Sequence, residues 1–500
     1  MNKIVLTIAV AVSVVLSVVR ALNKPFWYDE LLTLYVCSLR SPLEQWQALL
    51  RGADGAPPAF YWITSLLAWL PINPHLAYRL PAVAGWGLAL IGVYVFLSRR
   101  LGSMLGLCGS LLLALSPVAM YATEARPYGL MLGLTAFAAI CWQRLEDGKR
   151  WTFLLAVSLL ILTSVHYLAP LIVLCFAEAE LLRSAHARSI RRSAWGAFIL
   201  SAIPPILTSP ILLTMNREIG HSFWSKPHVS DIPSYWGASL AVTPGTIVVL
   251  LPICLFLLLR EIGQPSGPGQ PAVAARQSER MLSVALLLLP LQGFLLAIAV
   301  DGGFHPRYVQ TFIVGGCCAL PLLMEKFSEG TVKLIAACLL LVLAVPGGYR
   351  IAANRGAVTA ELHGRSVPAL AALAQVEDTR TPLVVSDELQ YLEALYYGGK
   401  PAADRLYYLG TKEMFSRFGM DVYDRPAAII PAQNSHTLGV IDFLRDHTTF
   451  SVLASSKHPL NWVPEYLIKH GWRMEFRSVI DGGILYAAVP PARVETSASW

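Results

Sequence analysis

Charged residues are scarce in this chain. Only 14% of its 500 residues are Asp, Glu, Lys or Arg, and 55% are hydrophobic, whereas soluble domains carry roughly 25% charged residues. The mean hydropathy is +0.53. This composition excludes an ordinary soluble protein and indicates a chain that crosses a lipid bilayer several times.

Nucleic-acid motifs, internal repeats and metal-ligand spacings are also lacking. The net charge of +7 is divided among short basic clusters, which is typical of membrane-topology signals, so no nucleic-acid partner is expected. None of the eight cysteines lies after residue 338. They predict apolar packing residues without a disulfide framework. No obligatory cofactor or metal is predicted, the alternative being a divalent ion at the adjacent carboxylates Asp29 and Glu30.

Long apolar segments along residues 1–350 predict a polytopic α-helical membrane protein. The count is about eleven, or 11–13 transmembrane helices depending on how residues 57–98 divide. A further stretch, 59–70, is too short to span and predicts an interfacial or re-entrant helix. The first segment could be a cleaved signal peptide, but no clean cleavage site follows it, which favours an uncleaved span. The segments are 4–22, 77–98, 103–120, 124–142, 151–168, 169–184, 193–213, 244–260, 280–299, 307–324 and 331–349.

Basic residues predict the orientation of these spans. They concentrate in alternate links, such as Arg99-Arg100 and Arg191-Arg192, and such links face the cytoplasm. The N-terminus is then inside, and residues 23–76 form a long first loop on the outer face. Arg20 and Lys24 are exceptions, because they flank the first span on its outer side.

Residues 351–500 change character and predict a separate α/β domain on the outer face. Short apolar stretches at 383–385, 428–430 and 450–453 are typical of strands. The segments 388–397, 438–446 and 464–470 have helical spacing. The expected organisation is therefore a membrane domain over 1–350 and an extracytoplasmic α/β domain over 351–500.

Unusual polar residues gather at span ends on the predicted outer face. Carboxylates can take a proton from a hydroxyl, and arginines bind phosphate oxygens in pairs. A reaction between a lipid phosphate and an outer acceptor needs both. The residues are Asp29, Glu30, Glu124, Arg126, Tyr128, His166, Tyr167, His305, Arg307 and Tyr308.

These motifs make the chain resemble the C-type polytopic glycosyltransferases. It looks like a bacterial relative of the dolichyl-phosphate-mannose:protein mannosyltransferases and the lipid A aminoarabinose transferases. The resemblance covers about residues 1–350. It is carried by Tyr28-Asp29-Glu30, by the segment 57–62, by Arg79-Leu80-Pro81-Ala82, by Ser116-Pro117 with Glu124-Ala125-Arg126-Pro127-Tyr128, and by Pro306-Arg307-Tyr308.

The resemblance implies an inverting transfer of a hexose or pentose from a polyprenyl-phosphate donor to an extracytoplasmic glycan, lipid or protein. Asp29 would be the general base and Glu30 would orient a substrate. The donor phosphate would be bound by Arg126 and Arg307, with Tyr128 or Tyr308 nearby. The implied location is a bacterial inner membrane, with the active site on the periplasmic face.

Other interpretations of the same residues remain open. Arg126 could be an interfacial anchor, Glu124 could simply pair with an arginine, and His166, Tyr167 and His305 could be packed polar residues. The rival functions are a transporter or flippase of a lipid-linked substrate, and a non-catalytic assembly or sensing protein. A transporter predicts charges through the mid-bilayer and pseudo-repeats, neither of which is evident in the sequence.

Overall fold

The computed structural model describes two compact units. The helical unit comprises the described residues of 2–25, 56–216 and 225–331, and the α/β unit those of 26–55, 217–219 and 367–491. The first outer loop thus groups in part with the C-terminal domain. The residues described are 2–219, 225–240, 243–263, 271–325, 327–328, 330–331, 367–376, 378, 380–409, 437–455, 462–480 and 482–491.

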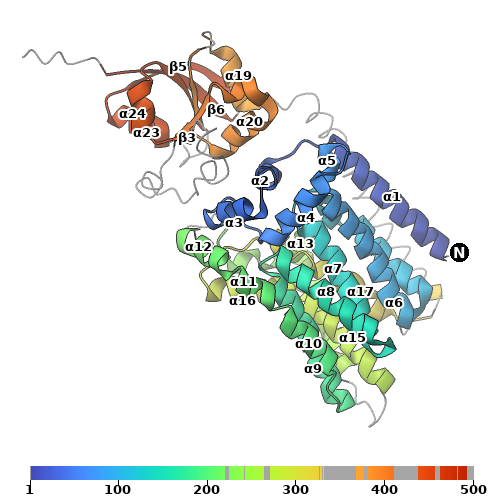
Figure 1. The fold of residues 1–500 in the computed structure, drawn as a ribbon. Helices are drawn as coiled ribbons and strands as arrows, with labels where there is room; N and C mark the ends of the chain where they lie inside the picture. The colour runs from blue at the N-terminus through green and yellow to red at the C-terminus, as the bar shows by residue number, and fades with distance from the viewer. Residues whose placement is uncertain are drawn as a thin grey trace, which may run out of the picture. The chain divides into compact units, whose positions relative to one another are not determined.

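Long apolar helices build the helical unit. Within the described residues, α1 (Asn2–Asn23), α6 (Leu80–Leu115) and α14 (Pro244–Ile262) have the length and composition to cross a membrane. A fourth candidate is the pair Ala275–Leu287 and Leu289–Ala299, bent by 51°. Figure 1 shows helices of this unit running side by side. A multi-pass membrane protein fits these helices.

The other helices of the unit are shorter. The predicted non-spanning stretch 59–70 forms α4 (Pro58–Ala68), and the predicted span 331–349 lies outside the described residues. The remaining elements are α5 (Pro74–Ala77), η1 (Pro117–Thr123), α7 (Tyr128–Gln143), η2 (Leu145–Asp147), α8 (Lys149–Val165), α9 (Ala169–Ala187), α10 (Arg192–Leu200), α11 (Ile203–Leu207), α12 (Ser209–Ile219), η3 (Val229–Asp231), α13 (Ile232–Leu240), α15 (Pro271–Leu287), α16 (Leu289–Ala299), η4 (Pro306–Tyr308) and α17 (Phe312–Met324).

Two predicted spans are joined and one is broken. Helix α6 covers most of both 77–98 and 103–120, but Gly102 has φ +82° and ψ 168°, so the chain turns there. The halves pack together, since Ser110 Oγ donates to Leu90 O at 2.9 Å. The predicted span 193–213 instead forms the short helices α10, α11 and α12. Pro204, Pro205 and Pro210 account for the breaks, because proline removes main-chain donors.

Small residues set the close packing of α6 against α7. A Cβ on Gly129 would lie 2.7 Å from Ala82 O, which is too close for any side chain. Gly129 and Gly133 are four residues apart on α7, a spacing that lets helix backbones approach in membranes. This contact fixes the start of α7, where Arg126 and Tyr128 lie, beside the start of α6.

A buried arginine at the start of α6 caps the end of α1. Arg79 is fully buried, and its guanidinium donates to Ala21 O at 2.6 Å, Lys24 O at 2.7 Å and Pro25 O at 3.1 Å. The last carbonyls of a helix have no partner within the helix and carry partial negative charge. Arg79 therefore anchors the chain just before the Asp29-Glu30 motif.

Replacing this arginine should destabilise the helical unit. Arg79→Met keeps the aliphatic stem but removes the three hydrogen bonds from the guanidinium to main-chain carbonyls, which should cost about 3 kcal/mol of unfolding free energy. The midpoint of thermal unfolding of the detergent-purified protein should fall by about 5 °C or more. Arg188→Met, at an exposed arginine after α9, is the control and should unfold like wild type. Equal midpoints for both variants would contradict the capping role.

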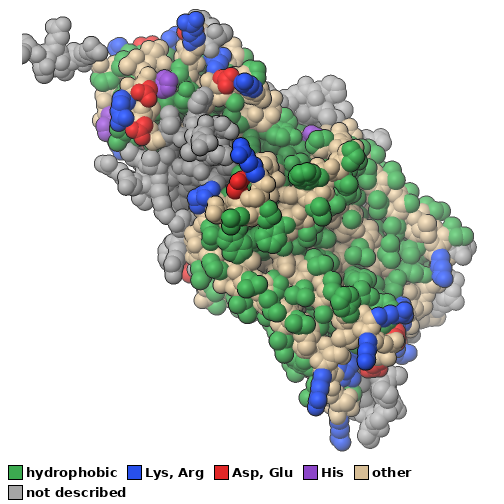
Figure 2. Space-filling view, viewed as in Figure 1, with side chains coloured by type: hydrophobic (Ala, Val, Ile, Leu, Met, Phe, Trp, Pro, Cys, Tyr) green, Lys and Arg blue, Asp and Glu red, His purple; other side chains and the backbone are tan. Residues whose placement is uncertain are grey.

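Several ion pairs lie at one end of the helical unit, which we call the basic end and define by the pairs named below. Glu180 is fully buried and is bound by Arg183 at 2.9 Å and by Arg191. Other pairs there are Arg99–Asp147 at 2.6 Å, Arg100–Glu279 at 3.0 Å and Arg280–Glu325 at 2.7 Å. Figure 2 shows Lys and Arg at this end, beyond a largely hydrophobic surface. That the basic end faces the cytoplasm stays a prediction.

The α/β unit is built on a six-stranded sheet of order β3-β2-β1-β4-β6-β5. Strands β1 to β4 pair in parallel, and β5 and β6 form an antiparallel hairpin. Val384 of β1 pairs with Tyr407 of β2 and Val452 of β4. The strands are β1 (Leu383–Val385), β2 (Leu406–Leu409), β3 (Thr437–Leu438), β4 (Phe450–Ser455), β5 (Arg473–Ile480) and β6 (Gly483–Val489).

Helices cover the sheet and confirm the predicted α/β class. All three residues of β1 are buried, as expected for a strand with both faces covered. Predicted strands 383–385 and 450–453 are confirmed, whereas 428–430 lies outside the described residues; β2, β3, β5 and β6 were not predicted. The helices that contact the sheet are α19 (Pro368–Gln375), α20 (Glu388–Ala403), α23 (Val440–Asp446) and α24 (Trp462–Lys469), and the unit also contains α2 (Tyr28–Cys37) and α3 (Pro42–Leu50).

Candidate active site

Asp29 and Glu30 lie in the first turn of α2, in the α/β unit. The chain is extended at Trp27, and the Glu30 carboxylate accepts a hydrogen bond from Trp27 N at 3.3 Å. This backward contact caps the helix start, and the negative charges suit its dipole. Asp29 is 5% exposed and Glu30 is fully buried. Glu30 therefore helps to hold the start of α2. Asp29 is the second residue of the same helix.

In the helical unit, four segments distant in sequence bring together the other predicted residues except Tyr167. Aromatic rings connect them: Tyr121–Tyr128 centroids are 5.3 Å apart, Tyr128–His166 5.9 Å, His166–Tyr308 6.0 Å and His305–Tyr308 6.0 Å. We call this group the basic–aromatic cluster. It comprises Lys24, Tyr121, Glu124, Arg126, Tyr128, His166, His305, Arg307 and Tyr308.

The cluster lies at the opposite end of the helices from the basic end. Helix α7 starts at Tyr128 and ends at Gln143 beside Arg144, so its 16 residues separate the two ends by about 24 Å. Helix α8 runs back, from Lys149 to the residue before His166. The start of α7 and the end of α8 therefore place the rings of Tyr128 and His166 next to each other.

Positive charge dominates this cluster. The Arg307 guanidinium lies 5.5 Å from the Tyr308 ring centre, and Arg126 is 7% exposed. Both arginines act electrostatically on His166. Glu124 lies 3.8 Å from the Lys24 ammonium group. The cluster contains three cations and one carboxylate, a composition suited to an anionic ligand such as a phosphate.

Both histidines of the cluster are held neutral and in a defined tautomer. His166 Nδ1 accepts from Leu168 N at 3.2 Å, and His305 Nδ1 accepts from Arg307 N at 3.3 Å, which leaves the proton on Nε2 of each ring. Burial, reinforced by Arg126 and Arg307, lowers the pKa of His166 to about 3. Burial and Arg307 lower the pKa of His305 to about 4. Each ring can therefore donate one hydrogen bond without carrying charge.

The lowered histidine pKa predicts acid sensitivity of the fold. The His166 side chain takes up a proton near pH 6.5 in the unfolded chain but only near pH 3 in the folded chain. The free energy of unfolding that depends on a neutral His166 is therefore fully present above pH 6.5 and is lost as the pH falls toward 3. At pH 5 the loss from His166 should be about 2 kcal/mol. Thermal unfolding at pH 8 and pH 5 should show a smaller loss in His166→Gln, which keeps an N–H donor. His186→Gln, at an exposed histidine of α9, should behave like wild type, and an unchanged pH slope in His166→Gln would refute the assignment.

Sequence reasoning gave no site role to Lys24 or Tyr121. Lys24 breaks the charge rule for the outer side of a span, and its contact with Glu124 gives a physical reason for that position. The position of Lys24 on the predicted outer side of the first span, where basic residues are uncommon, was thus the signal in the sequence that could have identified it as a site residue. Tyr121 lies in the polar run before α7 and contacts Tyr128. Tyr167, a predicted candidate, has its hydroxyl near Thr208, which follows α11.

The loop before α13 holds the segment that leads into the cluster. Ser225 O accepts from Phe304 N at 2.8 Å, and Ser225 Oγ donates to Phe304 O at 2.6 Å. Lys226 pairs with Asp301 at 2.9 Å. These contacts support residues 301–304 and so place His305 and Arg307.

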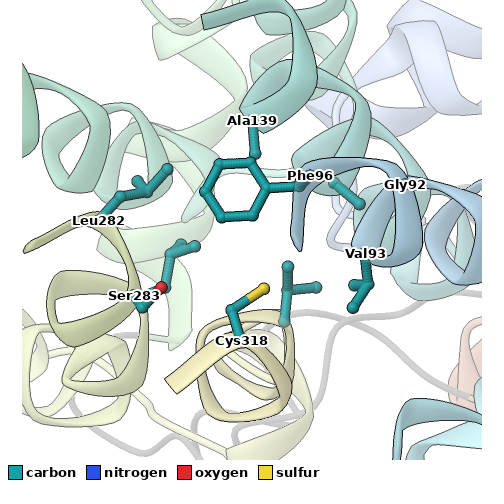
Figure 3. Close-up of a pocket in the computed structure, with 10 residues that line it drawn as sticks. Gly92, Val93, Phe96, Ala139, Leu282, Ser283 and Cys318 are labelled. Carbon is teal, nitrogen blue, oxygen red and sulfur yellow. The ribbon is translucent and has the colours of Figure 1, made fainter. Parts of the chain in front are cut away.

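A small pocket elsewhere in the helical unit is a gap in apolar packing. It lies among α6, α7, α15 and α17 and is lined by residues such as Gly92, Phe96, Ala139 and Cys318 (Figure 3). Its lining lacks carboxylates and cations, so it offers no charged group for acid–base chemistry or phosphate binding. As for metals, no group of three or more His, Cys, Asp or Glu side chains converges among the described residues.

Comparison with known proteins identifies the fold. No protein-family model and no curated protein matches the chain. The crystal structure of ArnT from Cupriavidus metallidurans bound to undecaprenyl phosphate matches 96% of this chain and 97% of its own, with a TM-score of 0.57 and 12% identity. An Archaeoglobus fulgidus oligosaccharyltransferase in complex with Zn and sulfate matches 98% of this chain and 74% of its own, with a TM-score of 0.47 and 11% identity.

The chain therefore has the GT-C glycosyltransferase fold. This confirms the predicted resemblance at the level of fold, including the similarity to a lipid A aminoarabinose transferase.

Proposed function

We propose that the protein is an inverting glycosyltransferase. It takes a hexose or pentose from a polyprenyl-phosphate donor and transfers it to a glycan, lipid or protein acceptor outside the cytoplasm. The observation that carries the proposal is the basic–aromatic cluster, in which Arg126 and Arg307 gather with aromatic rings at one end of a GT-C helical unit. A bacterial inner membrane, with this end on the periplasmic face, is the proposed location.

In this proposal Asp29 is the general base. Its carboxylate takes the proton from the acceptor hydroxyl or amine as that atom attacks the anomeric carbon of the sugar. The bond from the anomeric carbon to the phosphate oxygen breaks on the opposite face, so the configuration inverts. Glu30, which caps α2 through Trp27 N, holds Asp29 in the first helical turn.

Arg126 and Arg307 neutralise the phosphate as it leaves. The leaving group is a phosphate of low basicity, so no dedicated general acid is needed, and cationic stabilisation of the developing charge suffices. The neutral Nε2–H groups of His166 and His305 and the hydroxyls of Tyr128 and Tyr308 are further hydrogen-bond donors for the phosphate oxygens. Glu124, paired with Lys24, balances part of the positive charge.

A transfer assay tests the proposal against transport. Purified protein is given labelled polyprenyl-phosphate sugars together with envelope extract, with and without a chelator. Sugar should appear in the acceptor fraction and an equal amount of polyprenyl phosphate should be released, in both conditions. In proteoliposomes lacking acceptor, the donor should stay in its original leaflet. Donor translocation without sugar transfer would favour a flippase and contradict the proposal, and loss of transfer on chelation would contradict metal independence.

A further inference from the structure

Helix α2, which carries Asp29 and Glu30, lies against α20 of the C-terminal sheet (Figure 1). The Tyr397 hydroxyl makes two hydrogen bonds to one residue: it accepts from Phe26 N at 2.8 Å and donates to Phe26 O at 3.2 Å. Phe26 is fully buried, and its ring contacts Tyr396 edge-on at 5.9 Å. One phenol thus binds both main-chain polar groups of the residue three positions before Asp29.

The other end of α2 is bound to the same helix. The Tyr35 hydroxyl donates to Leu392 O at 2.8 Å. Burial raises the pKa of Tyr35, so this hydroxyl keeps its proton. Because Tyr35 contacts Leu392 while Phe26 contacts Tyr396 and Tyr397, α2 and α20 run antiparallel, with Asp29 between the two anchor points.

The contact at Phe26 does more than pack apolar surface. The residues leading into a helix have main-chain groups with no partner inside the helix, and Tyr397 satisfies both groups of Phe26. That fixes the direction in which the chain enters α2. A catalytic side chain must be held within about 0.5 Å of its productive position, so a change in entry angle would act directly on Asp29.

We propose that Tyr397 is a positioning residue for Asp29, through which the C-terminal domain takes part in the transfer step. This inference rests on the proposed function, in which Asp29 is the general base. Tyr397 acts through the backbone of Phe26 and does not itself touch the substrate.

The test is a double-mutant cycle on the transfer reaction. Tyr397→Phe removes only the hydroxyl, and kcat should fall about tenfold, with the donor KM within about twofold of wild type. Tyr486→Phe, on strand β6, is the matched control and should leave kcat unchanged. In an Asp29→Asn background, Tyr397→Phe should have almost no further effect, because there is no base left to position. A wild-type kcat in Tyr397→Phe, or the same tenfold loss in the Asp29→Asn background, would overturn the proposal.

A second variant distinguishes a specific effect at Phe26 from a general loss of structure. A measurement that does not depend on catalysis tests the contact even if the proposed reaction is wrong. Tyr35→Phe releases the far anchor, and its kcat should fall less than about threefold; a loss equal to that of Tyr397→Phe would contradict a specific role at Phe26. Hydrogen exchange of residues 26–32 should be about tenfold faster in Tyr397→Phe and unchanged in Tyr486→Phe. If wild type transfers no sugar, the proposed function fails, while unchanged exchange in Tyr397→Phe would independently refute the anchor.

Discussion

Asp29→Asn should reduce kcat for sugar transfer by about 10³-fold. The substitution keeps the shape of the side chain but removes its ability to accept the acceptor proton, and general-base catalysis contributes about 10²–10⁴-fold. The donor KM should change little, because the carboxylate acts on the acceptor during the chemical step. Single-turnover kinetics with labelled donor measure both quantities.

Two carboxamide variants separate this effect from a general loss of structure. Glu30→Gln removes a charge that caps α2 but leaves the proposed base, so kcat should fall by about tenfold at most. Asp54→Asn changes a carboxylate elsewhere in the same loop and should transfer at the wild-type rate. Transfer at the wild-type rate by Asp29→Asn would remove Asp29 from the reaction.

Removing either cluster arginine should reduce kcat/KM for the donor by about 10²–10³-fold. Arg126→Gln and Arg307→Gln each delete a guanidinium from the group around His166 and Tyr308. Because the charge on the phosphate grows as the sugar departs, kcat should fall as well as binding. Lysine at either position should restore part of the loss, since it supplies charge without the planar pair of donors.

The control for the arginine variants lies at the basic end. Arg99→Gln deletes a guanidinium that pairs with Asp147 at 2.6 Å and should leave donor kinetics unchanged. The affinity for added polyprenyl phosphate, measured as product inhibition, should weaken in Arg126→Gln and Arg307→Gln only. Equal inhibition constants in all three variants and wild type would show that the cluster does not bind the phosphate.

The sequence predicted the features that depend on local patterns. Apolar length placed α1, α14 and the two halves of α6, because a helix needs about 20 apolar residues to cross a bilayer. The charge alternation placed Arg126, His166 and Arg307 at one side, and the structure brings these three together. The prolines that break 193–213 are visible in the sequence. The prediction of one continuous span there relied on hydropathy averaged over the segment, which does not register single prolines.

Features that depend on distant partners could not be read from the sequence. Nothing local in residues 26–55 shows that they belong with a domain beginning more than 300 residues later, because the link is a phenol from Tyr397 on the backbone of Phe26. Strand β5 was missed because it is an edge strand with most side chains exposed, which leaves little hydrophobic signal. The capping role of Arg79 likewise depends on carbonyls more than 50 residues away.

The most direct test of the proposed reaction is the configuration of the transferred sugar. The purified protein is supplied with a polyprenyl-phosphate sugar of known anomeric configuration and with acceptor, and the product is analysed by NMR together with the amount of polyprenyl phosphate released. A single displacement assisted by Asp29 predicts an inverted anomeric centre and one polyprenyl phosphate per sugar transferred. A retained configuration, or polyprenyl phosphate released without a glycosylated product, would contradict it.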